Sequence, residues 1–189
     1  MILVNNYMYI NISNVYISLQ RIKEKKMTNS RIAGFIGLIS GLVAILSVFL
    51  VWVAVKVDVG TWEIFSSDTS GWDVFKNGDA DYYMIPMIIL IIGIIVLIVS
   101  IIELAGIKNS VPAKVMGSFV LLLGIACIAL TLFYYWEGVI QPVVNSGLGI
   151  DTDKAMELYP IGSGIIAGAV AGVLMFISGL LGLASKSSD

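Results

Sequence analysis

Long apolar runs separated by short polar stretches dominate the pattern of this chain. Four of these runs are 22 to 24 residues long, and their one charged residue, Glu103, lies at the end of the second. A helix of that length extends about 33–36 Å, enough to cross the hydrocarbon core of a bilayer. Because lipid offers the backbone no hydrogen-bond partners, the runs are predicted to be helices. The predicted spans are 32–55, 83–104, 115–136 and 161–184.

The polar stretch after the first run follows a different period. Five valines occupy alternate positions between 51 and 59, with Trp52, Ala54, Lys56 and Asp58 between them. A period of two is typical of a strand rather than a helix. We expect two or three short strands here, formed by this stretch, by TWEIF and, after the turn-rich SSDTSG, by WDVF.

The polar stretch between the third and fourth runs contains two further elements. Its apolar part, 139–144, is predicted to add a strand, and its DTDKAMEL segment is predicted to form a short helix capped by Asp151 or Thr152. The whole pattern predicts an all-α membrane protein: a four-transmembrane-helix bundle with a small extracellular β-element from the first outer loop.

Composition and charge support this class and orient the chain. Hydrophobic residues make up 58% and charged residues 13%, whereas soluble proteins average about 45–50% and about 25%. The predicted loops 56–82 and 137–160 hold ten of the thirteen acidic residues but three of the eleven basic ones. The positive-inside rule therefore predicts a multi-pass protein of the cell membrane with both termini cytoplasmic and these two loops outside. All four Trp lie at or beyond the outer boundary.

The segment 1–26 differs from the membrane domain, 27–189. It mixes Ile, Tyr and Asn and ends in the basic run RIKEKK. We interpret it as an extension upstream of a natural start at Met27. The alternative is a cytoplasmic tail whose basic cluster rests on anionic headgroups.

The chain offers little catalytic chemistry. It has no His and one Cys, Cys127, which argues against His-based acid–base chemistry, Cys/His zinc sites and an intramolecular disulfide. The spans lack the central ionisable groups of a proton relay. The aspartates of the first outer loop do not follow the spacing of a calcium loop; they are Asp68, Asp73, Asp79 and Asp81. We predict no enzyme activity, cofactor, metal or nucleic-acid partner.

Small residues recur every four positions in two spans. The fourth span carries Gly164, Gly168 and Gly172, and the first carries Ala33, Gly37 and Gly41. Residues four apart share one helix face, and small side chains let two helices approach closely. We expect the first and fourth spans to pack together inside the bundle. The alternative is a seam between copies or a docking site for a partner's span.

Two short motifs at the first outer loop resemble those of a known group of proteins. Phe49-Leu50-Val51-Trp52 ends the first run, and Ser70-Gly71-Trp72-Asp73 follows the strand-like stretch. From Met27 onward the chain resembles a broad group of small archaeal and bacterial four-span proteins, and this resemblance implies no activity.

A looser similarity is to the claudin-like tetraspan topology, in which a sheet built on the first loop lies outside. Trp52 and Gly71-Trp72 correspond to parts of the claudin loop motif, but its Leu and both cysteines are absent. The similarity therefore implies topology alone. Trp62 and Trp72 are expected to pack the small sheet, to lie in the headgroups or to contact a partner.

The function predicted from these features is that of a non-enzymatic interaction or scaffold protein, or an accessory subunit. Its partners would be the lipid bilayer and either further copies or another membrane protein. The alternative is an oligomeric pore or small-solute transporter.

Overall fold

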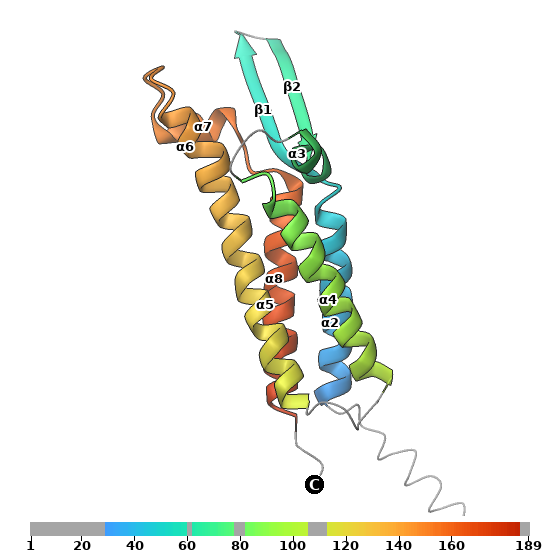
Figure 1. Cartoon of the computed structure of the whole chain (residues 1–189). Helices are drawn as coiled ribbons and strands as arrows, with labels where there is room; N and C mark the ends of the chain where they lie inside the picture. The colour runs from blue at the N-terminus through green and yellow to red at the C-terminus, as the bar shows by residue number, and fades with distance from the viewer. Residues whose placement is uncertain (1–28, 60–61, 78–81, 106–112, 186–189) are drawn as a thin grey trace, which may run out of the picture.

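The structure, a computed structural model, describes residues 29–59, 62–77, 82–105 and 113–185. The predictions for 1–26, Asp79 and Asp81 lie outside this part of the chain. The described chain forms four long helices that run side by side, with a two-stranded sheet at one end (Figure 1). We call this end the strand end. The long helices are α2 (Asn29–Ser47), α4 (Ile85–Ala105), the helix that begins as α5 (Ala113–Phe133), and α8 (Ser163–Leu183).

All four long helices are long and apolar enough to cross a membrane. Each presents large apolar side chains on its outer face. Leu46, Ile98, Leu122 and Ile166, one from each helix, are more than half exposed. Contiguous apolar surface of this kind is unusual on a soluble monomer.

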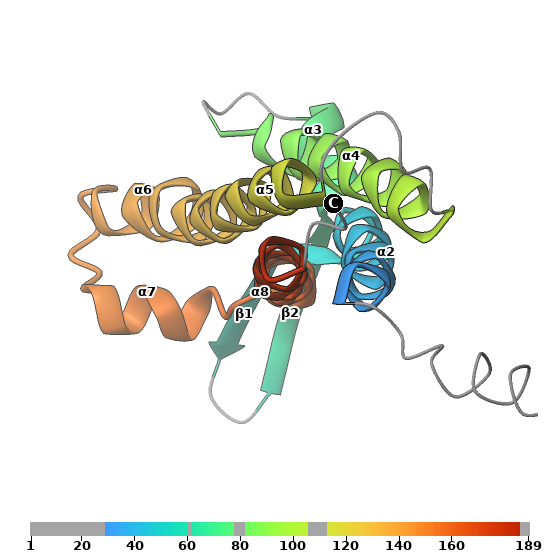
Figure 2. The ribbon, with the colours of Figure 1, turned by 90° about the horizontal axis from the view of Figure 1, so that it is seen from below.

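The order of packing around the bundle is α4, α2, α8 and α5. Helix α8 lies between α5 and α2 and packs against both (Figure 2). Helix α2 also packs against α4, whereas α4 and α5 meet much less. Glycines allow two of these close approaches. A Cβ atom at Gly41 of α2 would lie 2.9 Å from the Gly93 carbonyl oxygen of α4, and one at Gly124 of α5 would lie 2.7 Å from the Phe176 nitrogen of α8.

The third long helix continues beyond its predicted end at 136. It passes from α5 through a π-helical segment, η1 (Tyr134–Ile140), into α6 (Gln141–Val144), so the prediction of a strand at 139–144 is wrong. The Gln141 N–H bonds to the Trp136 carbonyl, five residues back rather than four. This wider turn precedes Pro142, whose ring would clash with the Gly138 carbonyl in a regular α-helix. The helical stretch of 31 residues is about 46 Å long.

The first long helix ends earlier than predicted. Helix α2 stops at Ser47, whose hydroxyl donates to the Ala44 carbonyl at 2.7 Å. The valine-rich stretch then forms β1 (Val51–Val59), which pairs antiparallel with β2 (Trp62–Ser70). The β-branched valines favour the strand over a last helical turn. The predicted turn at SSDTSG is strand as far as Ser70, and Gly71 begins a helix.

The predicted third strand at WDVF is wrong, because this segment is helix α3 (Gly71–Asn77). Ser70 forms a reciprocal cap: its hydroxyl accepts from the Asp73 N–H at 3.1 Å and donates to the Asp73 carboxylate at 2.6 Å. The predicted short helix is confirmed as α7 (Thr152–Leu158), in which the Asp151 carboxylate caps the Lys154 N–H at 2.9 Å.

Candidate functional site at the strand end

Trp52 lies at the centre of the strand end and is 1% exposed. Its indole Nε1 donates to the Ser47 carbonyl at 2.7 Å, which satisfies a carbonyl at the end of α2. The indole meets the Tyr134 ring of η1 edge to face, with 5.0 Å between ring centroids. Trp52 is therefore a core residue of the strand end.

Two glycines leave the space that the Trp52 indole occupies. A Cβ atom at Gly71 of α3 would lie 2.7 Å from the indole Nε1, and one at Gly164 of α8 would lie 2.5 Å from it. The chain before α8 also pairs with β1 through an isolated bridge between Ile161 and Val53. Trp52 thus joins the sheet to α2, α3, α8 and η1. Both glycines were predicted site residues, but nothing in the sequence indicated that they share one contact.

A second aromatic group is exposed beside this core. Phe49 and Trp72 stack with 6.0 Å between centroids, and Trp72 lies 5.9 Å from Phe75. Phe49 is 55% exposed, Trp72 37%, and Leu50 is also exposed. We call these four residues the aromatic patch. Trp72 therefore packs on the end of α2 and on its own helix, while the side chain of Trp62 lies outside the described part.

An open cavity of about 340 Å³ lies between α3 and η1. Its polar lining includes Asp73, Asn77, Tyr82, Tyr83 and Tyr134. In the described part of this lining, one carboxylate is accompanied by hydroxyl and amide groups, without a histidine, cysteine or basic side chain. Nor do three His, Cys, Asp or Glu side chains gather closely enough, anywhere in the described residues, to hold a metal ion. The cavity offers hydrogen-bonding groups rather than a catalytic constellation.

The small-residue face of α8 lies mainly against α5. A Cβ atom at Gly168 would lie 2.8 Å from the Thr131 methyl carbon, and one at Gly172 would lie 3.0 Å from the Gly124 carbonyl oxygen. Both neighbours belong to α5, whereas a Cβ atom at Gly164 of the same face would lie 2.7 Å from the Ser47 carbonyl oxygen at the end of α2. The face therefore packs against α5 as well as against the predicted helix.

The small-residue face of α2 is shared between two helices. Gly41 faces Gly93 of α4. Gly37 lies between the two helices, because an added Cβ atom would meet the Ser100 hydroxyl of α4 first and would lie 3.0 Å from the Ser178 hydroxyl of α8. That hydroxyl donates to the Ala33 carbonyl at 2.8 Å. The two helices expected to meet do so here, through a serine that the glycine pattern did not reveal. Both small-residue faces lie against helices of the same chain.

Among the described residues, the buried polar side chains of the bundle carry short hydroxyls or a thiol. The Ser40 hydroxyl donates to the Gly37 carbonyl at 2.8 Å, and the Cys127 thiol contacts the Gly168 carbonyl at 3.4 Å. In the part of the chain that the structure describes, every buried side-chain nitrogen or oxygen has a hydrogen-bond partner. These side chains donate to backbone carbonyls and leave no charge in the described interior.

The fold therefore places the chain in a broad class: a mainly helical protein with four helices able to cross a membrane and a small two-stranded sheet, which suggests a multi-pass membrane protein. Comparisons of the chain with protein-family models, with curated proteins and with solved structures gave no match.

Proposed function

We propose that this is a multi-pass protein of the cell membrane that works as a non-enzymatic interaction or scaffold protein, or as an accessory subunit of a larger membrane assembly. In this proposal the strand end faces outward and both termini are cytoplasmic. The bilayer surrounds the four helices, and the β1–β2 hairpin contacts a partner.

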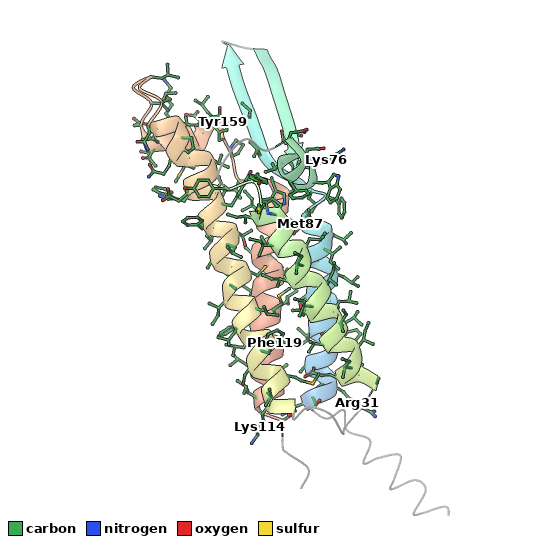
Figure 3. The ribbon with its side chains drawn as sticks, in the orientation of Figure 1. Arg31, Lys76, Met87, Lys114, Phe119 and Tyr159 are labelled. Carbon is green, nitrogen blue, oxygen red and sulfur yellow. The ribbon has the colours of Figure 1, made fainter. Side chains whose placement is uncertain are left out.

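The distribution of side chains supports the membrane and its orientation. Arg31 and Lys114 lie at the end of the bundle opposite the sheet, while Lys76 and Tyr159 lie at the strand end (Figure 3). The two loops at the strand end hold ten of the thirteen acidic residues of the chain. Basic residues are enriched on the cytoplasmic side of membrane proteins and Tyr at their interfaces.

The observation that carries the interaction role is the projecting hairpin. Strands β1 and β2 extend beyond the ends of α4 and α8 (Figure 1). Within the described residues, the Val53–Ile161 bridge is the one pairing that either strand makes outside the hairpin. A two-stranded ribbon is marginally stable by itself, and its free edges can pair with a strand of another protein.

Shortening the hairpin tests the interaction role. Ala54 and Asp68 are register partners, so replacing residues 55–67 by a two-residue turn keeps the strand bases, Trp52 and Gly71. The full and shortened chains, each with a C-terminal tag, are crosslinked in the native membrane and purified. A partner at fixed ratio that the shortened chain loses supports the proposal. Equal recovery with both chains, or the chain alone, contradicts it.

Ion and solute flux through protein-containing liposomes is the complementary test. The scaffold role predicts that flux equals that of empty liposomes, because the buried polar side chains among the described residues of the bundle are uncharged. Flux that depends on the protein, together with purification as a closed oligomer, would replace the scaffold role by the pore.

A further inference from the structure

We propose that the aromatic patch, together with Lys76, is a lipid anchor that lies at the boundary between hydrocarbon and headgroups of the outer leaflet and fixes the hairpin to the membrane surface. This inference rests on the proposed membrane location and adds a specific lipid contact to it.

The length of α2 sets the level of the patch. Its 19 residues extend about 28 Å, close to the roughly 30 Å thickness of the hydrocarbon core. Phe49 and Leu50 follow Ser47, the last residue of this helix, by two and three positions. If α2 crosses the bilayer, these side chains lie where the hydrocarbon meets the headgroups.

The patch also continues the exposed apolar stripe of α2. Leu42 and Leu46 are exposed on one face of α2, and Phe49 is exposed in the turn after the helix, where Trp72 stacks on it. If Leu42 and Leu46 contact acyl chains, the exposed apolar side chains continue from them toward the patch. Because the patch adjoins side chains that would face lipid, we infer that lipid covers the patch as well.

Helix α3 has the side-chain arrangement of an interfacial segment. Trp72, Phe75 and Lys76 lie three and four residues apart on one face, while Gly71 is buried and Val74 packs on the core. The Lys76 side chain is exposed at the strand end (Figure 3). Its long stem can lie along the apolar surface while the ammonium group reaches the lipid phosphates. Tryptophan is enriched at this depth because its ring is apolar and its N–H is polar.

Backbone hydrogen bonds hold α3 in this position. The Trp72 N–H donates to the Val48 carbonyl at 2.8 Å, and the Gly71 N–H donates to the Leu50 carbonyl at 3.2 Å. The anchor is thus attached to the end of α2 and, through Gly71, to Trp52 at the base of β1. Lipid contact at Trp72 would then set the angle at which the hairpin leaves the membrane.

Depth-dependent quenching of tryptophan emission tests the anchor. The full chain is reconstituted in vesicles whose lipids carry bromine either near the glycerol or near the chain ends. In a Trp62→Phe background, Trp52, Trp72 and Trp136 remain. Trp52 is a buried control, and Trp136, 40% exposed on η1, is a control for the outer boundary. Trp72→Phe should remove emission that bromine near the glycerol quenches more strongly than bromine near the chain ends.

The controls separate failure of the anchor from failure of the membrane proposal. If Trp136→Phe removes quenchable emission and Trp72→Phe does not, the patch is not in contact with lipid and the anchor is wrong. If neither tryptophan is quenched by lipid bromine, the membrane location is wrong as well. Stronger quenching of Trp72 by bromine near the chain ends would place it too deep and overturn the boundary position.

Discussion

Replacing Gly164 by Ala should destabilise the strand end, because α8 approaches the Trp52 indole without room for a methyl group. The added carbon would lie 2.5 Å from the indole Nε1 and 2.7 Å from the Ser47 carbonyl oxygen. These two atoms form the hydrogen bond that closes the end of α2. Neither neighbour is the free end of a flexible chain, so the indole or the helix has to move.

The expected cost has two parts. Overpacking a filled core costs about 1–3 kcal/mol, and weakening the bond between Trp52 and Ser47 costs about 0.5–1.5 kcal/mol. A total of about 3 kcal/mol would lower the melting temperature of a chain of this size by roughly 6–12 °C. The gain in helix propensity from Gly to Ala offsets less than about 1 kcal/mol.

Thermal unfolding in detergent, followed by tryptophan emission, measures the effect. Gly138→Ala is the matched control, since its Cβ atom would lie 3.4 Å from its neighbours on Tyr134 and Tyr82, an ordinary contact. Trp52→Phe removes the indole nitrogen, so adding it to Gly164→Ala should cost less than the two changes summed. A Gly164→Ala protein that melts like the Gly138→Ala protein, or a strictly additive double variant, would refute the role of the indole contact.

Three further changes test other contacts. Ser178→Ala removes the hydroxyl that reaches the Ala33 carbonyl and should cost about 0.6–1 kcal/mol, or roughly 2 °C in the same unfolding assay. Asp151→Ala removes the cap of α7 and should cost about 1 kcal/mol locally, seen as roughly fivefold faster hydrogen exchange at the Lys154 amide with little change in global unfolding. Gly124→Leu should separate α5 from α8 and lower the melting temperature by more than either of these changes; unchanged melting would contradict the close approach at that glycine.

The four long helices were predictable because each long apolar run favours a helix whatever surrounds it. Their ends depended on competing local signals. At Ser47 the alternating valines end α2 earlier than hydropathy indicates, and at Pro142 the π turn lets the helix continue where a strand was expected. The Ser70-x-x-Asp73 spacing is typical of a helix N-terminus and could have predicted α3. The strand pattern of the neighbouring residues favoured the wrong prediction.

Candidate site residues were predictable individually but not as contacts. The spacing of Gly164, Gly168 and Gly172 indicated a packed face, yet only the tertiary arrangement decides which helix covers it. Spacing within one helix carries no information on its partner. In the structure, Thr131 of α5 faces Gly168 and Gly124 of α5 faces Gly172. The contact between Tyr134 and Trp52 joins η1 to β1, which are far apart in the sequence, and has no local sequence signal.

The two short motifs at the strand end form one packing unit. Trp52 of the first motif occupies the space left by Gly71 of the second, and Phe49 of the first stacks on Trp72 of the second. The backbone joins them as well, since the Leu50 carbonyl accepts from the Gly71 N–H. A side chain larger than hydrogen at Gly71 would displace the indole. Loss of the Trp52 indole would remove the surface against which Gly71 of α3 packs. The two motifs therefore specify how the hairpin is attached to the helical bundle.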